Sequence, residues 1–166
     1  VLLLNTMIAK AQGNTAAKNE LLKKIIEKDP SNSDAHVEMA HDQMLRRNYA
    51  LAKKYYQKGL ESDPVNPDAL FGLGQSSYYT DDLKLSKQAF TKIIELYPQN
   101  SLGWAYLGKL AAEDENYKKA TDYIEKAIEL EHDYYDFWVD YGNYLRYQGK
   151  YDEAESAWTK AIQIND

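Results

Sequence analysis

Two histidines and a glutamate lie close together at His36, Glu38 and His41, and they form the cluster in the chain that comes nearest to a metal site. Zinc-dependent proteases place two histidines four residues apart on one helix face, with a glutamate directly after the first. Here the histidines are five residues apart, which turns His41 about 140° away from His36 around a helix. We therefore predict no metal site, and we expect His36 to belong to the core.

Other catalytic motifs are also missing from the sequence. No glycine-rich phosphate loop and no nucleophile elbow occur, and three histidines give a Ser-His-Asp arrangement no visible anchor. The chain has no cysteine, which excludes a disulfide framework and cysteine-bound metals. We predict neither catalysis nor a cofactor.

The sequence around the histidines repeats at an interval of 34 residues. Asp63-Pro64 follows Asp29-Pro30 by 34 residues, and Pro98 follows Pro64 by the same interval. Between the prolines, apolar residues spaced i, i+3, i+4 and i+7 indicate one helix face, and small and aromatic residues further on indicate a second helix packed against it. A period of this size is typical of stacked helical repeats. We predict an all-α chain of antiparallel helix pairs.

Alignment on the prolines divides the chain into a single array of repeats over residues 1–166. The units are a degenerate one at 1–32, then 33–66, 67–100, 101–134 and 135–166. We expect first helices near 1–12, 34–46, 68–80, 102–114 and 136–148, and second helices near 15–28, 50–62, 84–96, 118–131 and 151–164. His132 replaces proline at the end of its unit, so that boundary depends on packing alone. The chain starts without Met and lacks a polar closing helix, which predicts a fragment of a longer protein.

The repeat resembles the tetratricopeptide repeat family. Trp104, Leu107 and Gly108 match the W-x2-L-G part of its signature, and small, aromatic and proline positions follow in order. Pentatricopeptide repeats, which read RNA bases, have a slightly longer unit and lack this signature, so they match less well. The resemblance implies a right-handed α-solenoid of about five units that binds other proteins.

The family's first helices line a concave groove, so the resemblance also implies a set of groove residues. The alternative, that the apolar members pack in the core, stays open because stacked repeats have wide apolar stripes. The predicted groove residues are Val37, His41, Met44, Phe71, Gln75, Tyr78, Tyr79, Tyr106, Lys109, Val139, Asn143 and Tyr147.

The family's best-known ligand is the acidic C-terminus of chaperones, held by Lys, Asn and Arg side chains of successive repeats. Only Lys109 and Asn143 keep suitable chemistry here, and a carboxylate needs charge-assisted donors. We therefore predict that chaperone tails are not captured. The groove rim is instead acidic, which suits an amphipathic helix or extended segment carrying Lys or Arg. The rim residues are Asp34, Glu38, Asp68, Asp136 and Asp140, against Lys109 and Arg146.

The charge balance bears on the class of partner. Twenty basic against 26 acidic side chains give a net charge of −6, which disfavours nucleic acid binding. No apolar run approaches the roughly 18 residues that span a bilayer, so we expect no membrane insertion. We expect a soluble protein, with the cytoplasm favoured and an exported or periplasmic location left open.

Three functions agree with these features. The first is an adaptor or scaffold that grips a peptide or helix of a partner protein in the groove. The second is a self-assembling module that forms homo-oligomers through the uncapped ends of the array. The third is the regulatory arm of an enzyme whose catalytic domain lies outside this segment.

Overall fold

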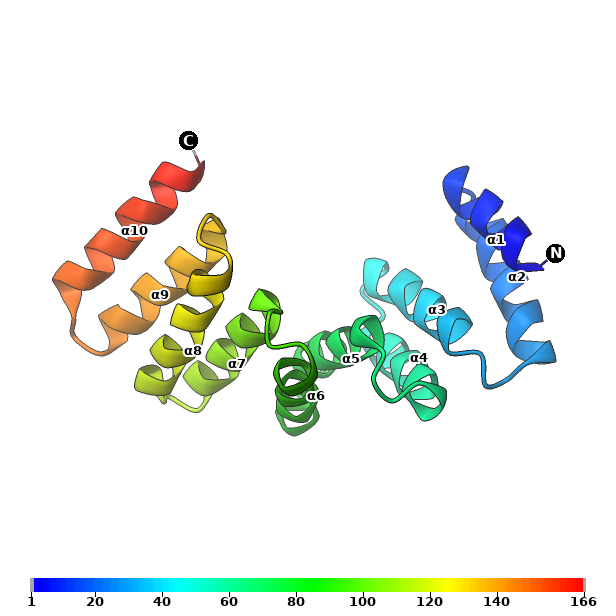
Figure 1. Cartoon of the computed structure of the whole chain (residues 1–166), viewed down its shortest axis with the longest axis horizontal. Coiled ribbons are helices and arrows are strands. Elements are labelled where there is room, and N and C mark those ends of the chain that lie inside the picture. The colour runs from blue at the N-terminus through cyan, green and yellow to red at the C-terminus, as the bar shows by residue number, and fades with distance from the viewer. Residues whose placement is uncertain (1, 166) are drawn as a thin grey trace. The chain divides into compact units, whose positions relative to one another are not determined.

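The computed structural model describes residues 2–165, without the side chain of Leu3, and every regular element in that range is an α-helix (Figure 1). The predicted all-α fold of helix pairs is confirmed, and the expected helix boundaries are met within about one residue; Val1 and Asp166 lie outside the described residues. The helices are α1 (Leu2–Ala11), α2 (Thr15–Lys28), α3 (Ser33–Leu45), α4 (Tyr49–Ser62), α5 (Pro67–Tyr79), α6 (Leu83–Leu96), α7 (Ser101–Glu113), α8 (Tyr117–Leu130), α9 (Tyr135–Tyr147) and α10 (Tyr151–Asn165).

The chain divides into two compact units. The first runs as far as Ala89 and the second begins at Phe90, so the division falls within α6. In the first unit α1 packs on α2, α3 on α4, and α5 on both α4 and α3. In the second unit α7 packs on α8, α8 on α9, and α9 on α10. Helices thus pack on their neighbours in the sequence, as in other stacked repeats.

The turn inside each helix pair recurs every 34 residues. One residue of each turn has a positive φ of 56–77°, and these residues are Gly13, Arg47, Asp81, Glu115 and Gly149. This conformation costs a residue with a side chain about 1–2 kcal/mol, whereas glycine adopts it freely. The N-terminal pair therefore keeps the register of the array although its sequence signature is weak.

Asparagines fix the starts of three first helices. Asn32, Asn66 and Asn100 each accept a hydrogen bond from the backbone N–H three residues later, at 3.0, 3.0 and 2.7 Å. Each bond satisfies a donor that the helix itself leaves unpaired. The start of α9 differs because Tyr134 takes this position and gives no side-chain cap.

The core of each unit lies where paired helices cross. The small residues predicted at this crossing, Ala52, Ser86, Ala120 and Ala154, are fully buried. Ser86 also donates a hydrogen bond to the Gly74 carbonyl across the pair, at 2.9 Å. Because the paired helices cross closely at these small residues, the larger side chains of the first helices pack on the next repeat.

Candidate functional site

A ring nitrogen anchors the first turn of three first helices. His36, Trp104 and Trp138 each donate a hydrogen bond to the carbonyl oxygen six residues earlier, at 2.9, 2.9 and 2.7 Å. His36 is only 5% exposed, so its predicted place in the core is confirmed. Among residues 2–165 no three side chains of the metal-ligating types lie together as an ion would require.

Val37 does not face the groove as predicted. It is 6% exposed and packs in a cluster with Ala40, Ala52 and Tyr56. One of its methyl carbons lies 3.0 Å from the point where a Cβ on Gly59 would be. The missing side chain at Gly59 leaves room for Val37 against α4, and the side chain turns inward to fill it.

Four of the predicted groove residues line one hollow between α3 and α5. They are His41 and Met44 from α3, and Phe71 and Gln75 from α5. The hollow has a volume of about 350 Å³, and we call it the aromatic hollow. Its other lining residues, Leu45, Tyr56, Asp68 and Gly72, were not among the predicted groove residues, although Asp68 was expected at the rim.

Tyr56 forms the floor of the aromatic hollow. Its side chain is 2% exposed and lies edge-on to the His41 ring, with ring centroids 5.7 Å apart. A Cβ on Gly72 would lie 2.0 Å from the Tyr56 ring, so only glycine leaves room for the tyrosine here. Burial and the charge of Asp68 raise the pKa of the Tyr56 hydroxyl, which keeps it protonated.

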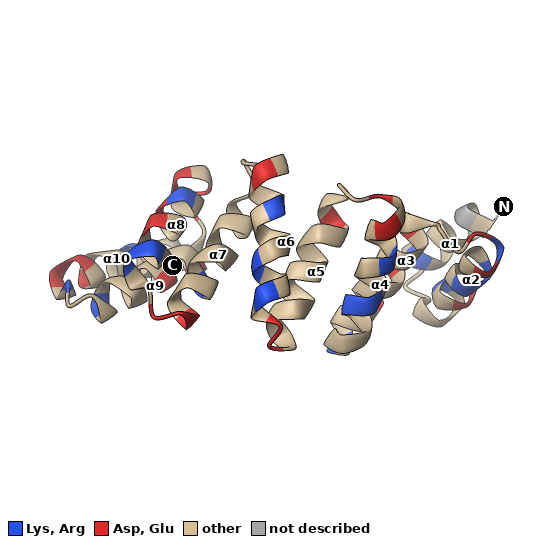
Figure 2. Ribbon diagram, turned by 90° about the horizontal axis from the view of Figure 1, so that it is seen from below, with Lys and Arg blue, Asp and Glu red and all other residues tan. Residues whose placement is uncertain are grey.

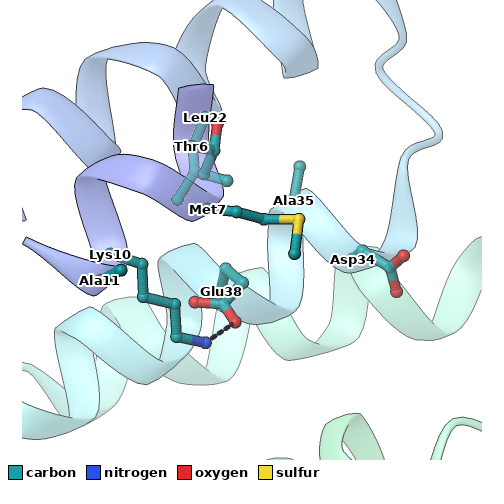
Figure 3. Close-up of a pocket in the computed structure, with 8 residues that line it drawn as sticks. All are labelled: Thr6, Met7, Lys10, Ala11, Leu22, Asp34, Ala35 and Glu38. Atoms are coloured by element: carbon teal, nitrogen blue, oxygen red, sulfur yellow. Dashed lines mark hydrogen bonds and ion pairs between the residues drawn. The ribbon is translucent and has the colours of Figure 1, made fainter. Parts of the chain in front are cut away.

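A second hollow lies between α1, α2 and α3, and we call it the N-terminal hollow (Figure 3). Its volume is about 400 Å³. The Met7 side chain extends across it toward Ala35, and Lys10 reaches Glu38 (Figure 3). Sequence reasoning missed this hollow because α1 carries so little of the repeat signature.

The two hollows are equivalent sites in successive repeats. Six lining residues of the aromatic hollow stand 34 positions after six of the N-terminal hollow. The pairs are Met7 and His41, Lys10 and Met44, Ala11 and Leu45, Leu22 and Tyr56, Asp34 and Asp68, and Glu38 and Gly72. The 34-residue offset, applied to the first repeat, is the signal that could have found the N-terminal hollow.

Glu38 is neutralised by the chain's own lysines. Its carboxylate pairs with Lys10 of α1 and with Lys18 of α2, the latter at 3.5 Å. Burial raises the pKa of Glu38, but the hydrogen bond and charge of Lys10, together with Lys18, outweigh it and hold the pKa below its usual value. The Glu38 carboxylate in the N-terminal hollow is therefore already paired with cations of the chain itself.

Three of the predicted tyrosines lie at the ends of first helices. Tyr79 stacks on Tyr49 with centroids 4.5 Å apart and meets Tyr78 edge-on. Tyr147 stacks on Tyr117 at 4.6 Å, and the Arg146 guanidinium lies 4.4 Å from its ring. Tyr79 and Tyr147 are 51% and 56% exposed, so each presents aromatic surface to solvent.

In the second unit, Tyr106 and Lys109 lie together on α7. Tyr106 stacks on Phe90 at 4.5 Å, and Lys109 is 5.8 Å from the Tyr106 ring. Lys109 also pairs with Asp140 of α9 at 3.3 Å. Burial raises the pKa of Asp140 and outweighs the opposing charge of Lys109. Val139 and Asn143, on the same helix as Asp140, are half-buried.

Charge is mixed over both units. Basic side chains are interspersed with acidic ones along the helices rather than gathered into a stripe (Figure 2). In the part of the chain that the structure describes, no helix is long and apolar enough to cross a membrane.

The fold and the repeated hollows define the chain as a helical repeat protein. Sequence profiles of the tetratricopeptide repeat match residues 37–101, 103–134 and 135–166. The chain therefore belongs to the tetratricopeptide repeat family, whose repeats generally mediate protein–protein interaction.

Solved structures share this fold. A crystal structure of MamA superposes with a TM-score of 0.88 at 19% identity, covering 96% of this chain and 94% of that one. MamA from Desulfovibrio magneticus RS-1 gives 0.90 at 16% identity, covering 99% and 93%. PilF of Pseudomonas aeruginosa gives 0.83 at 25% identity, covering 98% and 74%. No curated protein sequence matches the chain.

Proposed function

We propose that the chain is a scaffold or adaptor module that binds a peptide or helix of a partner protein along its first helices, and that it catalyses no reaction. The observation that carries the proposal is the aromatic hollow, which gathers His41, Met44, Phe71 and Gln75. Concave sites lined by apolar and aromatic side chains with a few polar groups suit the anchor side chains of a ligand.

The charges around the first helices favour a basic ligand over an acidic one. Asp34 and Asp68 are exposed at the two hollows. Lys109, one of two residues with the chemistry for a chaperone carboxylate, is instead paired with Asp140. A carboxylate would have to displace that partner, whereas a Lys or Arg meets the exposed Asp68 at the aromatic hollow.

A charge placed in the aromatic hollow tests the proposal. Phe71→Asp should abolish capture of partners from a lysate of the source cell, because an unpaired carboxylate would replace an aromatic contact. Leu51→Asp is the matched control, since Leu51 is an exposed apolar residue of α4 outside both hollows. Circular dichroism must show equal helix content. Equal capture by both variants would contradict the proposal.

Self-association is a second candidate function, favoured by exposed apolar residues on α1. Leu4, Met7 and Ile8 are all exposed on this helix. Burying such a stripe against a second copy would remove apolar surface from water. Light scattering should then show a concentration-dependent oligomer that Leu4→Glu dissociates, and a monomer at high concentration would rule this function out.

A further inference from the structure

The two hollows carry equivalent exposed aspartates, Asp34 and Asp68, but differ in an internal ion pair. In the N-terminal hollow Lys10 lies against Glu38, so the chain provides its own cation (Figure 3). In the aromatic hollow the equivalent residues are Met44 and Gly72, which carry neither charge. The aromatic hollow therefore lacks the internal ion pair of its neighbour.

An acid without a cation remains at the edge of the aromatic hollow. Asp68 is exposed and makes no hydrogen bond or ion pair with any residue that the structure describes. Beside it lies the half-buried Phe71 ring, and beneath both lies the buried Tyr56 ring, held in place by the space above Gly72. The hollow thus combines an exposed carboxylate with the half-buried Phe71 ring.

This combination favours arginine among the side chains of a ligand. A guanidinium stacks on aromatic faces and pairs with a carboxylate through two parallel hydrogen bonds, whereas an ammonium is more strongly hydrated and pairs as a point charge. The N-terminal hollow offers a cation less, because Lys10 already lies in it and none of the residues that line it is aromatic. Its apolar surface around Met7 and Ala35 suits an aliphatic side chain instead.

The spacing of the hollows limits the conformation of the ligand. Both hollows use α3, one between it and α1 and the other between it and α5, which packs on α3. Packed helices are about 8–10 Å apart. A polyproline II segment advances about 9 Å in one turn of three residues. Side chains three residues apart on such a segment would meet successive hollows.

We propose that the aromatic hollow is an arginine-binding site, and that the partner presents an extended segment whose arginine enters it while an aliphatic side chain three residues away enters the N-terminal hollow. This inference rests on the proposed function, because it names the ligand chemistry of the same surface. It adds a residue preference and a spacing that the groove alone does not imply.

Titration of the labelled protein with short peptides tests the inference. The probe is acetyl-Leu-Pro-Pro-Arg-amide, followed by amide chemical shifts in ¹⁵N-labelled protein. We expect shifts at Met7, Phe71 and Gln75, and at least about tenfold weaker binding to Asp68→Asn, because a charge-assisted pair is lost. Asp122→Asn is the matched control: Asp122 is an exposed aspartate of α8, a second helix, and lies outside both hollows.

Two further probes test residue choice and spacing. Replacing the arginine of the peptide with lysine should weaken binding, and removing one proline should abolish the joint shifts of Met7 and Phe71. Equal binding of the lysine peptide, or of Asp68→Asn, would overturn the arginine site. So would an absence of shifts in both hollows.

Failure of this inference can be told apart from failure of the proposed function. If Phe71→Asp loses its cellular partners while Asp68→Asn keeps them, the groove binds a partner but does not read arginine. If both variants keep their partners, both proposals are wrong. Loss of the same partner in both, with retention by Asp122→Asn, supports both.

Discussion

Repeats 33–66 and 135–166 build the same helices with different chemistry. Their first helices begin at Ser33 and Tyr135, which are three repeat lengths apart. At the start of α3, Asn32 caps the backbone and a small Ala35 follows. At the start of α9 no side chain caps the backbone, and Tyr134 packs on Phe137, with ring centroids 4.4 Å apart.

The difference shows that packing maintains the register of the array when local signals are lost. His132 replaces the proline that ends the earlier repeats, yet α8 ends at the equivalent residue to α6. The His132 carbonyl accepts the Trp138 hydrogen bond at 2.7 Å, and the His132 ring lies edge-on to the indole. Aromatic contacts thus fix the start of α9, whereas a cap and a proline fix the start of α3.

Of the variants that test this comparison, Phe137→Ala should lose the most stability. Phe137 is fully buried in the second unit, and removing a buried aromatic ring costs about 3–5 kcal/mol. Urea denaturation should show this loss. Ala35→Gly, at the equivalent position of α3, should cost only about 1 kcal/mol, the helix penalty of glycine. A loss below about 1 kcal/mol for Phe137→Ala would contradict the role of aromatic packing.

Asn32→Ala should have a smaller effect, of about 1 kcal/mol, because it removes one helix cap. The same denaturation experiment measures it. Gln57→Ala, on the exposed surface of α4, serves as the control. If Asn32→Ala proved as costly as Phe137→Ala, capping would matter as much as packing.

Substitutions in the turns of the two repeats should change the stability of the fold in opposite directions. Arg47 has φ 59° and Gly149 has φ 77°. Gly149→Ala should cost about 1 kcal/mol, and the cause is backbone conformation alone because nothing lies within 4 Å of the added Cβ. Arg47→Gly should gain up to about 1 kcal/mol by relieving the same strain. Thermal melting of both variants checks the signs, and a destabilising Arg47→Gly would contradict them.

Two equivalent acids should also differ in their pH dependence. The folded-state pKa of Glu38 lies below its usual value, so its charge stabilises the fold above the unfolded pKa and that stability is lost on acidification. The pKa of Asp140 is raised, so its charge opposes folding at neutral pH. Glu38→Gln should therefore destabilise at pH 7, and Asp140→Asn should stabilise.

Denaturant midpoints at pH 7 and near pH 3 measure both effects. Each difference from the wild type should shrink as the pH falls, because acid protonates the carboxylates whose charges produce it. Lys109→Met should remove the ion pair with Asp140 and further destabilise the fold at pH 7. Effects of equal sign for Glu38→Gln and Asp140→Asn would show that the environments of the two acids do not differ as described.

The 34-residue period made the helices predictable, because every repeat carries the same spacing of apolar and small residues. The structure brings together only some of the predicted groove residues. His41, Met44, Phe71 and Gln75 were expected there and lie together in one hollow. Val37 was expected there and is buried, because its orientation depends on the absence of a side chain at Gly59.

The N-terminal hollow was missed for a different reason. Five of its lining residues come from α1 and α2, where few signature positions are kept, although the positive φ of Gly13 shows that these helices share the register. Likewise, the floor of the aromatic hollow depends on the pairing of Tyr56 with Gly72, two residues in different repeats that no single repeat signature links.

The division of the chain has a spectroscopic consequence. All three tryptophans, Trp104, Trp138 and Trp158, belong to the unit that begins at Phe90. Tryptophan fluorescence therefore reports the unfolding of that unit alone, whereas far-ultraviolet circular dichroism reports the helices of both. The interval between the two denaturation midpoints is a direct reading of how independently the units melt, with no label and no substitution.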